Sequence, residues 1–318
     1  MPVPREWQRY QRDSLDGTGR TRFALAFLDG FWRWGQYLPF ADAVAEGRPS
    51  GPDPGRRDAD LAAALRFLLT GYPTGPDRSP AAHWAELGDC LRLVEELCDL
   101  VGRPDDELRP EEQALLARLE IFRAHTRRYA DPGDEAADRH YTRARRLLER
   151  LGDTRAVARI DLESAELALH RGRYRQVAGF VAHSAELAHR AGTDRDTELL
   201  AALHRVRADA LWWQDRVGEA AVGYGWALAD GYRFLDSPGQ PAGYARQVHR
   251  ELAAHAARRV VEARDRPDTT AVRVAAAIRR AAGLPEPGRD QLDAIRAGGP
   301  ATVAEILFPT PPDDHGLE

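Results

Sequence analysis

Residues 208–231, ADALWWQDRVGEAAVGYGWALADG, decide the fold class of this chain. Apolar and small residues recur along this stretch at spacings of three and four, which is the period of an amphipathic helix, and a polar break after Trp213 predicts a turn between two helices. The same spacing continues along nearly the whole chain, whereas alternating runs rich in β-branched residues are missing. We therefore predict an all-α protein.

Three sets of residues with a spacing of four and then three repeat in the middle of the chain. They are Ala137, Tyr141 and Ala144; Val177, Val181 and Ser184; and Ala220, Tyr224 and Ala227, offset by 40 and 43 residues. Each set lies in the second of two predicted helices, where small outer residues let helix backbones approach and the larger middle residue fills a groove. A single helical hairpin cannot bury its apolar stripe, so we predict stacked antiparallel hairpins.

This pattern resembles the tetratricopeptide repeat (TPR). The third hairpin carries the resemblance best, through Ala208, Glu219, Ala220, Tyr224, Ala227 and Leu228. The second hairpin matches at Ala165, Gly172, Tyr174 and Ser184, and the first matches only through its set of three. The resemblance covers about residues 105–232 and implies a TPR-like α-solenoid. The repeats run longer than the usual 34 residues of the family and lack its closing proline.

Clusters of glycine and proline mark the breaks between predicted regions. We expect an N-terminal helical cap or docking region at 1–104, TPR-like repeats at 105–235, a C-terminal helical cap at 236–308 and a disordered tail at 309–318. Residues 20–46 hold too many aromatic side chains for one helical seam: Phe23, Phe27, Phe31, Trp32, Trp34 and Tyr37. These aromatics either cap the first hairpin or form a docking surface.

In TPR proteins the first helix of each pair lines a concave groove. The resemblance therefore implies a binding groove formed by Arg159, Glu166, His170, Arg205, Asp209, Trp212 and Trp213. Adjacent helical residues point about 100° apart, so one tryptophan should pack inward while the other faces the groove. We choose Trp213 for the groove, because it shares an i, i+4, i+8 line with Arg205 and Asp209. The alternative is that both tryptophans are core residues.

Composition removes several classes of function. The net charge of −5 gives no general attraction to nucleic acid or anionic membranes. The sequence contains no lysine and no asparagine, a bias that a GC-rich genome favours. Without lysine it has no P-loop lysine and no lysine to form a Schiff base, and without asparagine it has no N-glycosylation site. Any nucleotide-driven engine must lie on another chain or on a missing part of this one. We expect no cofactor, no metal and no catalytic residue.

Cellular location follows from the cysteines and from the hydropathy. Cys90 and Cys98 lie eight residues apart on a predicted helix, about 12 Å along its axis, so they cannot form a disulfide with each other. They are expected to be small buried side chains in a reducing compartment. No apolar stretch approaches membrane-spanning length, and the N-terminus lacks the apolar region of a signal peptide. A cytoplasmic protein is the expectation.

These features favour a non-catalytic scaffold or sensor module that binds a protein or peptide in its groove. The chain also resembles the sensor arms of bacterial signal-transduction ATPases, which implies a nucleotide-hydrolysing partner domain or chain. Neither nucleic acid nor a membrane is an expected partner.

Two alternatives remain open. Arg250 and His255 resemble the active motif of the all-helical HEPN ribonucleases, although equivalent pairs at Arg118 and His125 and at Arg78 and His83 arise as often as chance predicts. Alternatively, a stripe of Arg139, Arg143, Arg146 and Arg150 could bind anions. The stripe is expected on the outer surface, partly neutralised by Asp138 and Glu149. His183, Glu186 and His189 spread too widely around one helix for a metal site.

Overall fold

The computed structural model describes residues 19–25, 28, 60–61, 63–65, 67–68, 80–131, 133–190, 196–237, 242–266 and 270–311. All regular structure in these ranges is helical and none of it is strand, which confirms the all-α prediction. No described helix has both the length and the apolar content needed to cross a membrane. Contacts divide the chain into two compact units, residues 1–160 and 161–318.

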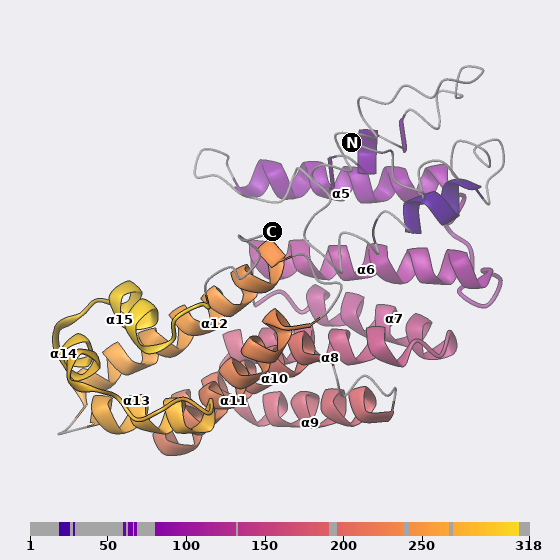
Figure 1. Ribbon diagram of the computed structural model, residues 1–318. Coiled ribbons are helices and arrows are strands. Elements are labelled where there is room, and N and C mark those ends of the chain that lie inside the picture. The colour runs from indigo at the N-terminus through magenta and orange to yellow at the C-terminus, as the bar shows by residue number, and fades with distance from the viewer. Residues whose placement is uncertain are drawn as a thin grey trace, which may run out of the picture. The chain divides into compact units, whose positions relative to one another are not determined.

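The first unit is built around one central helix. It contains α5 (Pro80–Leu97), α6 (Pro110–Ala130), α7 (Ala136–Arg150) and the start of α8 (Thr154–His170). Helix α6 packs against both α5 and α7 (Figure 1), and it begins with Pro110 in the first turn followed by Glu111 and Glu112. The Glu112 carboxylate accepts a hydrogen bond from the backbone N–H of Arg109 at 2.8 Å, which caps the helix.

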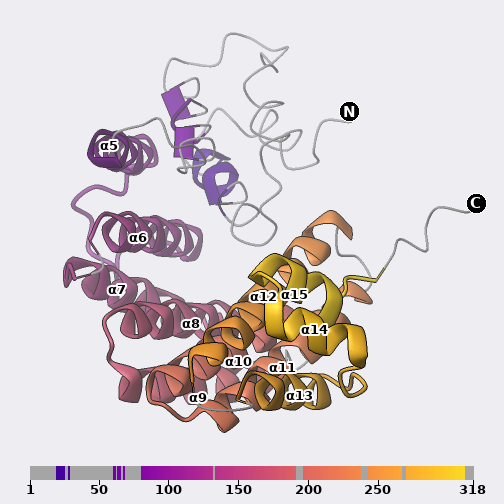
Figure 2. The same cartoon turned by 90° about the vertical axis from the view of Figure 1, so that its left-hand side faces the viewer.

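The second unit is built around α11. After the end of α8 it contains α9 (Tyr174–Arg190), α10 (Thr197–Trp213), α11 (Val217–Leu235), α12 (Ala242–Glu262), the short 3₁₀ helix η1 (Ala263–Asp265), α13 (Thr270–Ala281), α14 (Arg289–Ala297) and α15 (Pro300–Leu307). Helix α11 packs against α10, α12 and α13, and α12 also packs against α15 (Figure 2). The apolar side chains of these helices form one continuous core.

Glycines in α11 permit this close packing. A Cβ at Gly225 would lie 2.4 Å from the Cβ of Ala281 on α13, and one at Gly223 would lie 3.0 Å from the Cβ of Ala208 on α10. A Cβ at Gly231 would lie 2.8 Å from the side chain of Leu252 on α12. Three different neighbours therefore approach α11 where its side chain is only a hydrogen atom.

All three repeated sets are buried, as their spacing predicts. The residues are Ala137, Tyr141 and Ala144 on α7; Val177, Val181 and Ser184 on α9; and Ala220, Tyr224 and Ala227 on α11. Helical periodicity alone therefore identified the inward face of each of these helices.

The turns after α7, α8 and α10 close in the same way. Gly152, Gly172 and Asp215 have positive φ angles of 68°, 68° and 63°. At each turn, the backbone N–H of the residue that follows the positive-φ residue donates to a carbonyl of the preceding helix. The bonds are Asp153 to Leu148 at 3.0 Å, Arg173 to Ala168 at 2.8 Å and Arg216 to Leu211 at 3.0 Å. This is the Schellman motif, which favours glycine in the left-handed position. It ends α10 directly after the two tryptophans.

The observed units differ from the predicted regions. The predicted repeats, 105–235, are divided between the two units, and the predicted C-terminal cap belongs to the same unit as the third hairpin. The reason is that α11 packs on α12 and α13 as well as on its hairpin partner α10. Contacts also continue past the expected boundary at 308, since the Tyr232 hydroxyl donates to the Pro309 carbonyl at 3.2 Å.

Two expectations concern the N-terminal aromatics and the cysteines. Of the aromatics, Phe23 is buried, whereas Phe27, Phe31, Trp32, Trp34 and Tyr37 lie outside the described residues.

Cys98 is buried and Cys90 is half-buried, and both are free thiols. Burial raises the pKa of the Cys90 thiol, and the charges of Asp89 and Glu86 raise it further.

Candidate binding site

A buried carboxylate organises the second unit. Asp209 of α10 is 2% exposed, and its oxygens accept hydrogen bonds from the Tyr224 hydroxyl at 2.7 Å and from Nη2 of Arg259 at 2.8 Å. Nε2 of His255 lies 3.0 Å from Oδ2, and Nη1 of Arg205 lies 3.4 Å from the same oxygen. An ionised carboxylate only accepts, so Nε2 of His255 carries the proton in this contact. We call these five side chains the Asp209 network.

The network holds its central acid in the charged form. Burial by itself would raise the pKa of Asp209, but the hydrogen bond and charge of His255, the Tyr224 hydrogen bond and the charge of Arg205 together hold it below the usual range. Burial raises the pKa of the Tyr224 hydroxyl, which therefore stays protonated and donates. Four donors occupy the acceptor positions of one carboxylate, so Asp209 is a structural anchor with no capacity left for a ligand.

Ion pairs extend this network to alternate helices of the chain. Glu166 of α8 pairs with Arg205 of α10, and Nη1 of Arg259 on α12 donates to Glu262 at 2.7 Å. A second link joins α12 to α10, where the Tyr244 hydroxyl donates to Glu198 at 2.6 Å. Side chains of α8, α10 and α12, which are every second helix, thus form one connected row.

The two tryptophans share one cation. Trp212 is 3% exposed and Trp213 is 58% exposed, yet the guanidinium carbon of Arg259 lies 5.5 Å from the Trp212 ring centre and 5.4 Å from that of Trp213. The guanidinium carbon of Arg266 also lies over the Trp212 ring, 4.7 Å from its centre. Cation–π contacts of this kind contribute about 0.5–2 kcal/mol each. Asp209 therefore positions Arg259, and Arg259 in turn supports the exposed indole of Trp213.

No family model, curated protein or solved structure matches this chain.

The structure brings together five of the residues predicted for the groove. Glu166, Arg205 and Asp209 are joined by ion pairs, and Trp212 and Trp213 join them through Arg259. Asp209 and Trp212 are buried, so they hold other side chains in place and face no solvent. The division of the tryptophans into one packed and one exposed ring agrees with the prediction.

The other two predicted residues are His170 and Arg159. His170 is exposed at the C-terminal end of α8. Arg159 is half-buried on α8 and belongs to the first unit.

Sequence reasoning missed the partners of Asp209. Spacing indicates only a packing role for Tyr224 and no role for Arg259. A buried tyrosine needs a partner for its hydroxyl, and that requirement is the signal that could have pointed from Tyr224 to an acid on the facing helix. Nothing comparable marks Arg259, because its partner lies 50 residues away in the sequence.

The expected arginine stripe on α7 is wrong in one position. Arg143 is half-buried: it donates to Asp105 at 2.8 Å and to Glu120 at 3.1 Å, so it does not lie on a free outer face. Glu120 is buried, and it also contacts Nδ1 of His140 at 2.6 Å. Burial alone would raise the pKa of Glu120, but the His140 hydrogen bond and the neighbouring arginine charges lower it. Arg139, Arg146 and Arg150 are exposed.

The other polar motifs have structural partners. His183 contacts the buried carboxylate of Asp161 at 2.5 Å, and Glu186 pairs with Arg190. In the described ranges no group of three or more histidine, cysteine or acidic side chains is placed to hold a metal ion.

The residues of the ribonuclease alternative face different surroundings. His255 turns its Nε2 to Asp209, whereas Arg250 is exposed about 140° further round α12.

Proposed function

We propose that this chain is a non-catalytic scaffold or sensor module of the cytoplasm, built as a TPR-like stack of antiparallel helical hairpins. In this proposal a protein segment or peptide binds along the row of side chains contributed by α8, α10 and α12. The observation that carries the proposal is the exposed indole of Trp213 at the edge of the buried Asp209 network.

The contacts between alternate helices support this arrangement. In a stack of hairpins the first helices lie next to one another, so their side chains should meet across the stack. Arg205 meets Glu166 from the preceding pair and shares Asp209 with Arg259 from the following one. A row of this kind offers an extended surface to a partner chain.

The chemistry of the surface favours recognition over catalysis. Binding energy at protein interfaces concentrates in a few tryptophan, tyrosine and arginine side chains that are held rigidly before the partner arrives. Trp213 is such a side chain, since Arg259 holds its ring and Asp209, Tyr224 and Glu262 hold Arg259. Arg205 and Glu166 retain partial exposure and can orient a polar partner.

The proposal is tested by selecting peptides from a displayed random library on the full chain and measuring their affinities for two variants. Trp213→Ala removes the proposed anchor. Trp226→Ala is the matched control, because Trp226 is also exposed, at 45%, but lies on α11 outside the Asp209 network. Selected peptides should bind Trp213→Ala at least about tenfold more weakly and Trp226→Ala with unchanged affinity.

Circular dichroism on both variants checks that each keeps its helical content. Equal binding to Trp213→Ala and to the unmodified chain, or a library that yields no binder at all, would contradict the proposal.

A further inference from the structure

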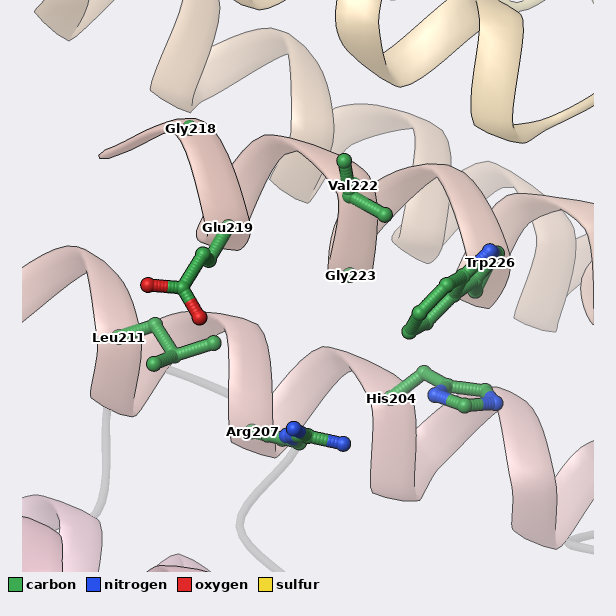
Figure 3. A pocket seen from close by; sticks show the side chains of 8 residues that line it. All are labelled: His204, Arg207, Leu211, Gly218, Glu219, Val222, Gly223 and Trp226. Carbon is green, nitrogen blue, oxygen red and sulfur yellow. The ribbon is translucent and has the colours of Figure 1, made fainter. Parts of the chain in front are cut away.

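A second surface feature lies between the two helices of the third hairpin. A pocket of about 200 Å³ is lined by His204, Arg207 and Leu211 of α10 and by Gly218, Glu219, Val222, Gly223 and Trp226 of α11 (Figure 3). The α10 residues of this pocket alternate with Arg205, Asp209 and Trp213. Helical geometry therefore places it on roughly the opposite side of α10 from the Asp209 network.

One end of the pocket has an aromatic wall. The rings of His204 and Trp226 lie with their centres 5.5 Å apart and tilted by 60°, and both side chains stand at the same end of the pocket in Figure 3. Leu211 and Val222 supply aliphatic surface. Because an apolar cavity of about 150 Å³ is enough to bind benzene, a pocket of this size accommodates a single aromatic ring.

The charges at the pocket favour an anion. Arg207 is exposed and, within the described residues, forms no ion pair. The one acid of the lining, Glu219, is already held by Arg216 through two hydrogen bonds of 2.7 and 2.5 Å. Burial lowers the pKa of His204, although the nearby Asp230 carboxylate, 3.6 Å from its Nε2, opposes this shift. Asp230 itself pairs with Arg233, so Arg207 is the charged group of the lining that remains without an ion pair in the described part of the chain. A cation would meet a neutralised acid and a free guanidinium.

We propose that this pocket binds a small aromatic carboxylate, with the ring packed against Trp226, Leu211 and Val222 and the carboxylate paired with Arg207. Aromatic contact supplies affinity, and the planar guanidinium supplies selectivity for a carboxylate over an amine. The site does not depend on the peptide-binding proposal, because the two use opposite sides of α10.

The test uses 3-phenylpropionate as the probe and the ¹⁵N-labelled tryptophan indole N–H resonances of the full chain as the readout. Trp226→Phe and Trp213→Phe assign the two relevant signals. The probe should shift the Trp226 signal with a Kd on the order of 1 mM, which is typical for a ligand of this size, and should leave the Trp213 signal unmoved. Propionate, which lacks the ring, and 3-phenylpropylamine, which reverses the charge, should bind at least about tenfold more weakly.

Variants separate the two halves of the site. Arg207→Gln should weaken 3-phenylpropionate about tenfold and remove the preference over the amine, since it deletes a charge-assisted hydrogen bond. Arg258→Gln changes another exposed arginine of the same unit, on α12, and should have no effect. Val222→Phe should fill the pocket and abolish binding. Equal affinity for the amine, unchanged binding to Arg207→Gln, or a shift at Trp213 instead of Trp226 would each overturn the proposal.

Discussion

Arg259 donates a hydrogen bond to the buried carboxylate of Asp209 over 2.8 Å, although 50 residues separate them in the sequence. The same guanidinium contacts the ring of exposed Trp213, so a single arginine connects the interior of the second unit to its surface. This relationship explains why two tryptophans stand side by side at the end of α10. One ring is packed beneath Arg259 and Arg266, and the other is presented to solvent.

Replacing Asp209 by asparagine should destabilise the protein by about 3 kcal/mol, because Arg259, Arg205 and His255 would lose the charge that compensates their burial. The free energy of unfolding in urea at pH 7, followed by circular dichroism, measures the loss. Asp215→Asn is the control: Asp215 pairs with Arg266 on an exposed surface, so the change should stay within about 0.5 kcal/mol. A loss below about 1 kcal/mol for Asp209→Asn would show that the network contributes little.

The same variant has a pH signature. The pKa of Asp209 is lower in the folded than in the unfolded chain, so its contribution is complete above the unfolded value of about 4 and is lost as the pH falls toward the folded value. The difference in unfolding free energy between the unmodified chain and Asp209→Asn should therefore shrink below about pH 4. A difference that stays constant down to pH 2 would contradict this assignment.

His249 should make the second unit sensitive to mild acid. Its ring is buried against Tyr232, at 4.4 Å between centres, and burial lowers its pKa to about 4. Because the pKa of His249 is lower in the folded than in the unfolded chain, its contribution to stability is fully present above about pH 6.5. That contribution is lost as the pH drops toward the folded pKa. Between pH 7.5 and pH 5 the loss should be about 2 kcal/mol.

His249→Phe should remove that part of the pH dependence, as measured by urea unfolding at the two pH values. Because carboxylates titrate mostly below this window, the comparison isolates histidine. An unchanged slope in His249→Phe would exclude His249 as its source.

Substitution by alanine should have opposite effects on stability at two nearby glycines, one in a Schellman turn and one inside a helix. Gly172 has φ near 68°, where an alanine Cβ is strained, so Gly172→Ala should cost about 1 kcal/mol. Gly179 lies within α9, and a Cβ added there would have no atom within 4 Å, so Gly179→Ala should stabilise by about 0.5–1 kcal/mol. Thermal unfolding of the two variants distinguishes them, and two changes of the same sign would be inconsistent with these turn and helix assignments.

Gly225→Ala tests the close approach of α11 and α13. The new Cβ would lie 2.4 Å from both the Ala281 Cβ and the Ile278 carbonyl oxygen, so α13 must shift, at a cost of about 2–3 kcal/mol. Gly218→Ala, where nothing lies within 4 Å, should change the unfolding free energy by no more than about 0.5 kcal/mol. Similar urea midpoints for both variants would contradict the packing of these helices.

Local patterns predicted the helices, their buried faces and the inward Trp212. The periodic positions such as Ala220, Tyr224 and Ala227 are set by neighbours within one helix turn, which sequence spacing records. The Asp209 network could not be predicted in this way, since its donors come from α10, α11 and α12 and meet only after these helices pack. The packing of α13 on α11 could not be predicted either, because it depends on Gly225. In the sequence alone, a glycine at this position indicates only a poor helix former.

The position of a selected peptide on the protein shows whether the row formed by α8, α10 and α12 is the binding surface. A benzophenone placed in such a peptide can be photo-crosslinked to the full chain and the attachment sites found by mass spectrometry. We expect crosslinks within 161–170, 197–213 and 242–262, concentrated near Trp213. Crosslinks that cluster instead on α14, α15 or the outer side of α11 would contradict it.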